Sequence, residues 1–120
     1  MTATGEQADE GWTIASPAAN VPDRKPVKVT VDGEDVMLYR IEDQVLAVSN
    51  RCTHQGAPLY RGMVKAIGTT PVVTCPAHGS MFQLTDGRVV RGPAMRPIRA
   101  YEARINGGAV EVRRPTEPGG

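Results

Sequence analysis

The stretch NRCTHQGAPL, residues 50–59, is followed downstream by VTCPAHGSMF, residues 73–82. The 120-residue chain has two cysteines and two histidines, and these two stretches hold all four of them: Cys52, His54, Cys75 and His78. Each pair lies beside Gly and Pro and follows a short apolar run that reads as a strand. Because loops at the ends of two strands can face each other, the four side chains are expected to close on one metal centre.

Short strands joined by tight turns are predicted along the whole chain. No window of 11 or more residues keeps the apolar spacing of a helix without Gly or Pro, so the predicted fold class is all-β. The single exception is a short helix or turn near 57–61. Alternating apolar residues and Asn, Asp and Gly turn signals predict strands at 26–31, 36–41, 45–49, 64–67, 72–74, 81–84, 89–90, 101–105 and 109–112.

The length predicts one domain. It is expected at residues 11–114, with the metal-binding part at about 50–95 and flexible tails at 1–10 and 115–120. A small, turn-rich domain gains stability from a metal site.

The N-terminus has neither the basic start nor the apolar run of a secretory signal, and no stretch is apolar enough to span a bilayer. A cytoplasmic protein with no membrane partner is therefore expected, and a nucleic-acid partner is not expected either. In a reducing compartment, the two cysteines are not expected to form a structural disulfide.

Charge is distributed unevenly along the chain. Residues 1–50 carry four Lys or Arg against nine Asp or Glu, whereas residues 51–99 carry seven cations against Asp86 alone, a net charge of +6. The segment with the four candidate ligands is either a solvated basic face or a surface for an anionic partner.

The arrangement of the ligands bears on the metal. Zinc sites of the Cys2His2 type usually draw a C-x2–4-C pair and an H-x3–5-H pair, but here each loop supplies one Cys and one His. Such mixed pairing favours a two-iron centre with unlike ends, in which two histidines replace two cysteines on one iron. A structural zinc domain is the alternative.

The two motifs, C-T-H-Q-G-A-P-L and C-P-A-H-G-S-M-F, resemble the cluster loops of the Rieske [2Fe-2S] family, and G-P-A at 92–94 resembles its proline loop. The similarity extends from about Trp12 to Arg113. It implies a Rieske-type fold of small antiparallel β-sheets, with a cluster-binding subdomain formed by two loops plus a proline loop. It also implies one [2Fe-2S] cluster per chain, with two ligands on the buried iron (Cys52 and Cys75) and two on the outer iron (His54 and His78).

The resemblance also assigns roles around the cluster, which it gives to Gly56, Gly79, Ser80, Phe82 and Pro93. The two glycines let backbone N–H groups approach the sulfurs, although ordinary turn formation would also explain them. The Ser80 hydroxyl is expected to donate to a cluster sulfur if it points inward. Phe82 stands where high-potential relatives carry a tyrosine hydroxyl.

This sequence departs from those high-potential relatives at two further positions. Ala57 and Ala77 replace the cysteines that join the two loops in a disulfide, so the chain resembles the ferredoxin type. Fewer hydrogen bonds to sulfur lower the reduction potential, whereas nearby cations raise it modestly. The expected potential lies in the lower half of the Rieske range of about −150 to +300 mV, and a Phe82→Tyr variant is expected to raise it.

A cluster whose irons already have all their ligands can accept and release an electron, but it has no open position at which a substrate could bind. An oxygenase needs a second, mononuclear site, typically with two further histidines, which this chain lacks. The resemblance therefore implies a non-enzymatic carrier between an NAD(P)H-dependent flavin reductase and a terminal oxygenase. Partners would dock at the His54/His78 tip, with Met63, Met81 or Met95 as adaptable contacts, and at least one of the three is expected to pack in the core instead. The alternative is a small subunit held permanently in a larger reductase, such as nitrite reductase.

Overall fold

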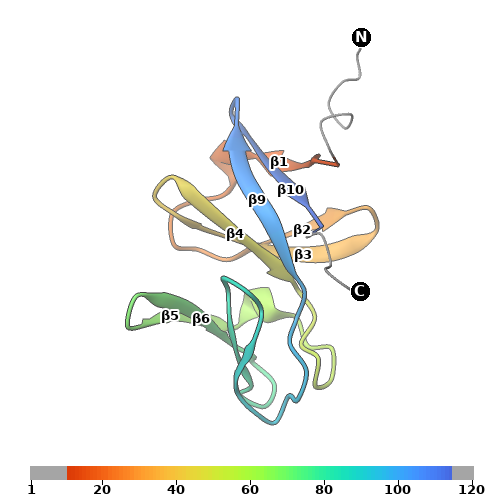
Figure 1. The fold of residues 1–120 in the computed structure, drawn as a ribbon, viewed down its shortest axis with the longest axis vertical. Coiled ribbons are helices and arrows are strands. Elements are labelled where there is room, and N and C mark those ends of the chain that lie inside the picture. The colour runs from red at the N-terminus through yellow and green to blue at the C-terminus, as the bar shows by residue number, and fades with distance from the viewer. Residues whose placement is uncertain (1–10, 115–120) are drawn as a thin grey trace.

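The computed structural model describes residues 11–114, and the tails predicted at 1–10 and 115–120 lie outside them. Within the described residues, ten strands form two antiparallel sheets, and two short 3-10 helices lie in the connections between strands (Figure 1). The elements are β1 (Thr13–Pro17), η1 (Ala18–Asn20), β2 (Val27–Val31), β3 (Glu34–Ile41), β4 (Gln44–Ser49), η2 (Leu59–Arg61), β5 (Met63–Ile67), β6 (Thr70–Thr74), β7 (Met81–Gln83), β8 (Val89–Arg91), β9 (Ala100–Asn106) and β10 (Ala109–Arg113).

The larger sheet has six strands in the order β1-β10-β9-β4-β3-β2. Its β2-β3-β4 portion is the meander that the alternating sequence predicted. The turn between β2 and β3 places both Asp32 (φ 52°) and Gly33 (φ 83°) at positive φ, which the Asp-Gly pair tolerates. The edge strands β1 and β2 contact each other, so the sheet curls around its own apolar interior.

The smaller sheet has four strands in the order β5-β6-β7-β8 and lies within a single excursion of the chain. The excursion leaves the larger sheet after β4 and returns at β9, and these two strands are paired neighbours. A backbone hydrogen bond of 2.8 Å from Ser49 N to Arg99 O ties its two ends together. Residues 50–99 therefore form one subdomain at the lower end of the molecule in Figure 1, which we call the loop subdomain.

Two apolar cores stabilise the molecule, and β3 contributes to both. Val36 and Leu38 point into the interior of the curled sheet, whereas Met37 and Tyr39 point toward the loop subdomain. Because β3 is buried on both faces, its sequence is a nearly continuous apolar run. The second core contains both cysteines, so the candidate metal centre is continuous with the packing between the two sheets.

The all-β prediction is confirmed, and the nine predicted strands correspond to β2–β10. The turn expected near 57–61 is the 3-10 helix η2. β1 was not predicted: its segment TIASP is short, and its pairing with β10 is a long-range contact. Within residues 11–114, neither helical segment has the length and apolarity required to cross a lipid bilayer.

Candidate metal centre

The two motif loops have the same backbone design. In loop 1 (residues 50–58), Cys52 N donates to Ala57 O at 3.0 Å and Gly56 N donates to Cys52 O at 2.7 Å. In loop 2 (residues 75–80), Cys75 N donates to Ser80 O at 2.7 Å and Gly79 N donates to Cys75 O at 3.2 Å. Each cysteine is therefore held at both its N–H and its carbonyl by residues four and five positions ahead.

The turn that follows each cysteine explains why both loops carry a glycine four residues after it. Gly56 has φ 79° and Gly79 has φ 81°, a conformation that side chains with a Cβ rarely adopt. Their own N–H groups bond to the cysteine carbonyls, so they close the loops. The N–H groups that bond to a cysteine sulfur belong to His54 and Gln55 in loop 1.

Loop 1 is anchored by Asn50, a residue that the sequence analysis did not single out. Asn50 is a buried polar side chain, and its Oδ1 accepts a 2.8 Å hydrogen bond from Tyr60 N. Its backbone carbonyl accepts from Leu59 N at 2.8 Å, and its N–H donates to Asp35 O of β3 at 3.0 Å. One asparagine therefore joins the start of loop 1 to its end and to the larger sheet. In the sequence, the only sign of this role is that Asn50 is a polar residue between the strand predicted at 45–49 and the Cys52 motif.

The two thiols lie next to each other inside the protein. Cys52 and Cys75 are each 3% exposed and unoxidised, and Cys52 is within hydrogen-bonding reach of Cys75. Burial raises the pKa of the Cys52 thiol, hydrogen bonds from the N–H groups of His54 and Gln55 oppose this rise, and proximity to Cys75 reinforces it. Without metal, Cys52 is therefore protonated at neutral pH, and metal binding must release that proton.

The two imidazoles lie together on the surface. His54 and His78 are both exposed, their ring centroids are 5.1 Å apart, and their planes meet at 87°. The loops thus bring together all four residues singled out in the sequence, with the sulfur pair inside and the nitrogen pair outside.

This separation into two pairs bears on which metal group fits. Among residues 11–114, no three His, Cys, Asp or Glu side chains converge on a point that one metal ion could occupy. A tetrahedral zinc site requires such convergence. A sulfur pair behind a nitrogen pair matches instead the two unlike ends of a two-iron centre, so the donors present fit a [2Fe-2S] cluster.

A third segment, the proline loop (residues 92–96), is bound to both motif loops. Its Gly92–Pro93 peptide is cis, and Pro93 is exposed. In loop 1, Thr53 Oγ1 donates to Arg96 O at 2.6 Å. In loop 2, Ser80 Oγ accepts a 2.9 Å hydrogen bond from Ala94 N. Thr53, the middle residue of the Cys-x-His motif, was not identified from sequence because the bond spans 43 positions.

The remaining predicted residues lie around the thiols. Ser80 and Phe82 are fully buried, and Phe82 belongs to the same apolar core as both cysteines. Since the Ser80 oxygen accepts from Ala94, its own proton stays available for a sulfur acceptor. Ala57 packs against this core and Ala77 is exposed.

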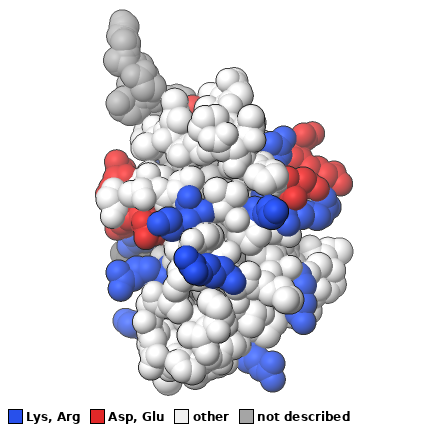
Figure 2. Space-filling view, turned by 180° about the vertical axis from the view of Figure 1, so that it is seen from behind, with Lys and Arg blue, Asp and Glu red and all other residues white. Residues whose placement is uncertain are grey.

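Charge separates along the long axis of the molecule. Figure 2 shows acidic side chains beside the larger sheet, whereas the end that carries β5 and β6 shows only basic ones on this face. The single acid of residues 51–99, Asp86, forms an ion pair of 3.0 Å with Arg88. Burial raises the pKa of Asp86, but the hydrogen bonds from Arg88 and Gln83 and the positive charge of Arg88 together lower it.

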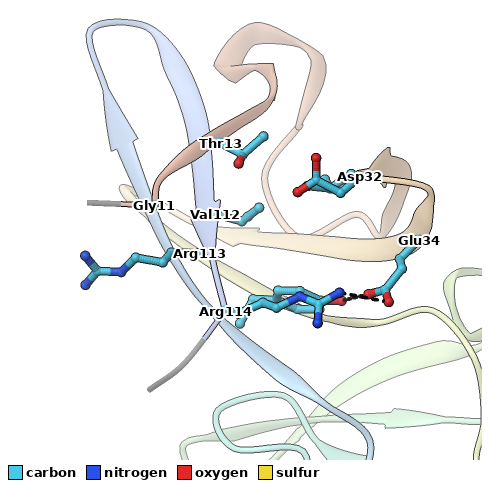
Figure 3. A pocket seen from close by; sticks show the side chains of 9 residues that line it. Gly11, Thr13, Asp32, Glu34, Val112, Arg113 and Arg114 are labelled. Carbon is cyan, nitrogen blue, oxygen red and sulfur yellow. Dashed lines mark hydrogen bonds and ion pairs between the residues drawn. The ribbon is translucent and has the colours of Figure 1, made fainter. Parts of the chain in front are cut away.

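A cavity of about 440 Å³ lies in the larger sheet, away from the four candidate ligands (Figure 3). Glu34 lines it and binds Arg114 at 2.9 Å, a pair that Figure 3 marks with dashed lines. Tyr101 Oη donates to the same carboxylate at 2.8 Å. The Glu34 carboxylate is therefore already occupied by partners within the protein.

The fold and the candidate donors define a class: a small all-β protein in which a buried pair of thiols lies behind an exposed pair of imidazoles. The model of the Rieske [2Fe-2S] domain matches residues 11–102. The chain belongs to this family, carries one [2Fe-2S] cluster and functions as a one-electron carrier.

The matches to relatives of known role extend over nearly the whole length of those relatives. The chain is 29% identical, over 86% of its residues and 95% of the relative, to the ferredoxin component of a naphthalene 1,2-dioxygenase system from Pseudomonas aeruginosa. It superposes on the ferredoxin of carbazole 1,9a-dioxygenase from Nocardioides aromaticivorans IC177 with a TM-score of 0.78 and 28% identity, covering 88% and 99% of the two chains. It also resembles a protein assigned as the small subunit of an NADH-dependent nitrite reductase from Mycobacterium tuberculosis, with a TM-score of 0.77, 31% identity and coverage of 88% and 96%.

Proposed function

We propose that this chain is a freely diffusing ferredoxin that receives one electron from an NAD(P)H-dependent flavin reductase and delivers it to a terminal oxygenase. The main support for the proposal is that the two imidazoles lie side by side on the surface and that both thiols are buried behind them. Support comes from the ferredoxin components of dioxygenase systems, which the chain matches over nearly their full length.

The proposed ligands are Cys52 and Cys75 on the inner iron and His54 and His78 on the outer iron. When bound, the cluster supplies a site that accepts and returns one electron. The chain's own residues bury the sulfur end and present the imidazole edges to a partner, which shortens the path an electron must travel. Thr53 and Ser80 keep the proline loop against the two motif loops.

The proposed docking site is the tip formed by the two motif loops and the proline loop. Met95 is 92% exposed on the proline loop, and Met63 is 70% exposed at the start of β5, next to loop 2 through its pairing with Thr74. Met81, the third methionine expected at the tip, is buried instead. Flexible thioether side chains suit a contact that must form and dissociate with more than one partner. Small interfaces of this kind favour the short lifetime that a carrier needs.

An oxygenase activity of the chain itself is not proposed. Its two histidines are both in the motif loops, so a separate mononuclear iron site of the two-histidine, one-carboxylate type lacks its nitrogen ligands. We also propose a cytoplasmic location, in which two unpaired buried thiols are stable.

A second candidate is a small subunit held permanently in a larger reductase. The similarity to the nitrite reductase small subunit, at 31% identity, favours it. The two proposals differ in assembly: a carrier exchanges between two partners, whereas a subunit copurifies with one at fixed stoichiometry.

The test starts with the tagged chain purified from its native host. A red-brown protein with two irons and two acid-labile sulfides per chain, and an electron paramagnetic signal only after reduction, is expected. Cys75→Ser and His78→Ala should each lose the cluster, whereas Ser16→Ala, a buried serine substitution in the larger sheet, should keep it. A colourless, folded wild-type chain after anaerobic reconstitution would refute the carrier proposal, and a constant 1:1 partner would favour the subunit.

A further inference from the structure

Five cations of the loop subdomain have no ionic partner among the described residues. They are exposed, and among residues 11–114 none of them forms an ion pair: Arg51, Arg61, Lys65, Arg91 and Arg96. We call them the cationic collar. The two other cations of residues 51–99 each form an ion pair, Arg88 with Asp86 at 3.0 Å and Arg99 with Glu34 at 3.4 Å.

Four of the five cations belong to segments that border the tip, whereas Lys65 on β5 lines a groove shared with the larger sheet. Arg51 directly precedes Cys52, and Arg61 ends η2 after loop 1. Arg91 ends β8 just before the proline loop, and Arg96 belongs to that loop, where its carbonyl accepts the hydrogen bond from Thr53. Lys65 is two residues after Met63 on β5, so the two side chains share one face of the strand.

Exposed apolar side chains lie next to some of these cations in the sequence. Met95, which is 92% exposed, precedes Arg96, and Val90, which is 43% exposed, precedes Arg91. Met63, at 70% exposed, shares its strand face with Lys65. Apolar contacts bordered by charges are the usual composition of a protein–protein interface.

We propose that the cationic collar recognises an acidic surface on the electron-transfer partner and orients it over the imidazole edges. The inference rests on the proposed function, since it takes the tip as the exit for electrons. Complementary charge raises the rate of encounter and selects the orientation, and it leaves dissociation fast because exposed charge pairs are weak.

A protein partner fits this surface better than a nucleic acid does. The whole chain has a net charge of only +1 and a pI of about 7.8, far from the strongly basic character of nucleic-acid-binding domains. Single-stranded nucleic acids also need exposed aromatic rings for stacking. The one aromatic residue of loop 1 and η2 is Tyr60, which is half-buried and has the Arg61 guanidinium 5.6 Å from its ring centroid.

The test measures oxidation of the reduced holoprotein by two small oxidants of opposite charge. Ferricyanide is a triple anion and tris(phenanthroline)cobalt(III) a triple cation, and stopped-flow absorbance gives both rate constants between about 10 mM and 0.2 M salt. The ferricyanide rate should fall as salt rises, and the cobalt rate should rise. Using the ratio of the two rates removes any change in the reduction potential, which affects both reactions in the same direction.

A matched pair of variants locates the effect. Lys65→Glu reverses a charge on β5 of the loop subdomain, and Lys28→Glu makes the same change on β2 of the larger sheet; both lysines are exposed and lack an ion pair within the described residues. At low salt, Lys65→Glu should lower the ratio of the ferricyanide to the cobalt rate several-fold, because reversing one charge acts in opposite directions on a trivalent anion and a trivalent cation. Lys28→Glu should change the ratio by a smaller factor than Lys65→Glu does.

The outcomes separate this inference from the proposed function. If the protein is coloured and reducible but its rate ratio changes equally in both variants, or does not depend on salt, the proposed role of the cationic collar is wrong. The proposal that the chain is an electron carrier would still stand. Competition at about 0.15 M salt tests the class of partner: poly-glutamate should slow ferricyanide oxidation more than duplex DNA or phosphatidylserine vesicles do. Stronger competition by the DNA or the vesicles would overturn the assignment to an acidic protein.

Discussion

Replacing Ser80 by alanine tests how the proline loop supports the metal centre. Ser80 is fully buried, and its Oγ accepts a 2.9 Å hydrogen bond from Ala94 N, a residue that is only 4% exposed. The Ser80→Ala variant removes the acceptor and leaves a buried N–H without a partner. Such a loss costs about 1–3 kcal/mol of folding free energy. For a domain of this size, each kcal/mol lowers the thermal midpoint by about 4 °C.

The same substitution should lower the reduction potential. The Ser80 proton is not used by Ala94, so it can be donated to a cluster sulfur, and reduction makes that acceptor more negative. A hydrogen bond to a charged acceptor is stronger than one to a neutral acceptor by about 1 kcal/mol. For one electron, this difference corresponds to about 40 mV.

Two measurements on the holoprotein check the Ser80 prediction: thermal unfolding at one fixed scan rate and a redox titration monitored by absorbance. Ser16→Ala is the matched control, because Ser16 is 7% exposed in β1 and its Oγ donates to Pro17 O at 2.9 Å, far along the chain from the loops. It should leave the potential unchanged. If Ser80→Ala kept both the midpoint and the potential of the wild type, the proposed role of the hydroxyl would be refuted.

Three further predictions concern other contacts. Thr53→Val removes the 2.6 Å bond to Arg96 O and should speed iron loss to a chelator several-fold, whereas Thr53→Ser should not. Gly62→Ala would place a Cβ 2.0 Å from Thr74 O, so it should cost about 2 kcal/mol or more in urea unfolding of the holoprotein; wild-type stability would contradict that packing. The tyrosine hydrogen bond lowers the pKa of Glu34 from 4.5, so its stabilisation is present above that value and lost as pH falls through the lower folded pKa. Glu34→Gln should therefore flatten the acid limb of a stability-versus-pH curve below about pH 4.5, and an unchanged limb would contradict this assignment.

Much of the fold could be predicted because its signals are local. Asp32–Gly33 and Asn106–Gly108 terminate strands at turns, and alternation in 27–31 marks a strand with one buried face. β1 could not be predicted, because TIASP is short and forms a strand only by pairing with β10, which lies almost 100 residues later. Local preference carries little information about such a contact.

The convergence of the four Cys and His side chains could also be predicted, but the hydrogen bonds that hold their loops in place could not. When every Cys and His of a chain lies in two short loops, metal binding is the explanation that the pattern favours. Asn, Thr and Ser are common in turns of every kind, so their presence in a loop indicates no particular role. Asn50 and Thr53 matter because of partners that are distant along the chain or outside their own motif. For the glycines of the motif loops, the structure gives a turn explanation through their positive φ values.

The sequence by itself determined which side chains can bind the metal, that the fold is all-β, and that the loop-bearing half is cationic, since these depend on residue type and spacing. Only the tertiary structure decided that the thiols are inside and the imidazoles outside, that the proline loop is bound to both motif loops, and which cations lack an ionic partner. Burial, hydrogen bonding and charge pairing depend on which distant segments meet, and that is fixed by the packing of the two sheets against each other.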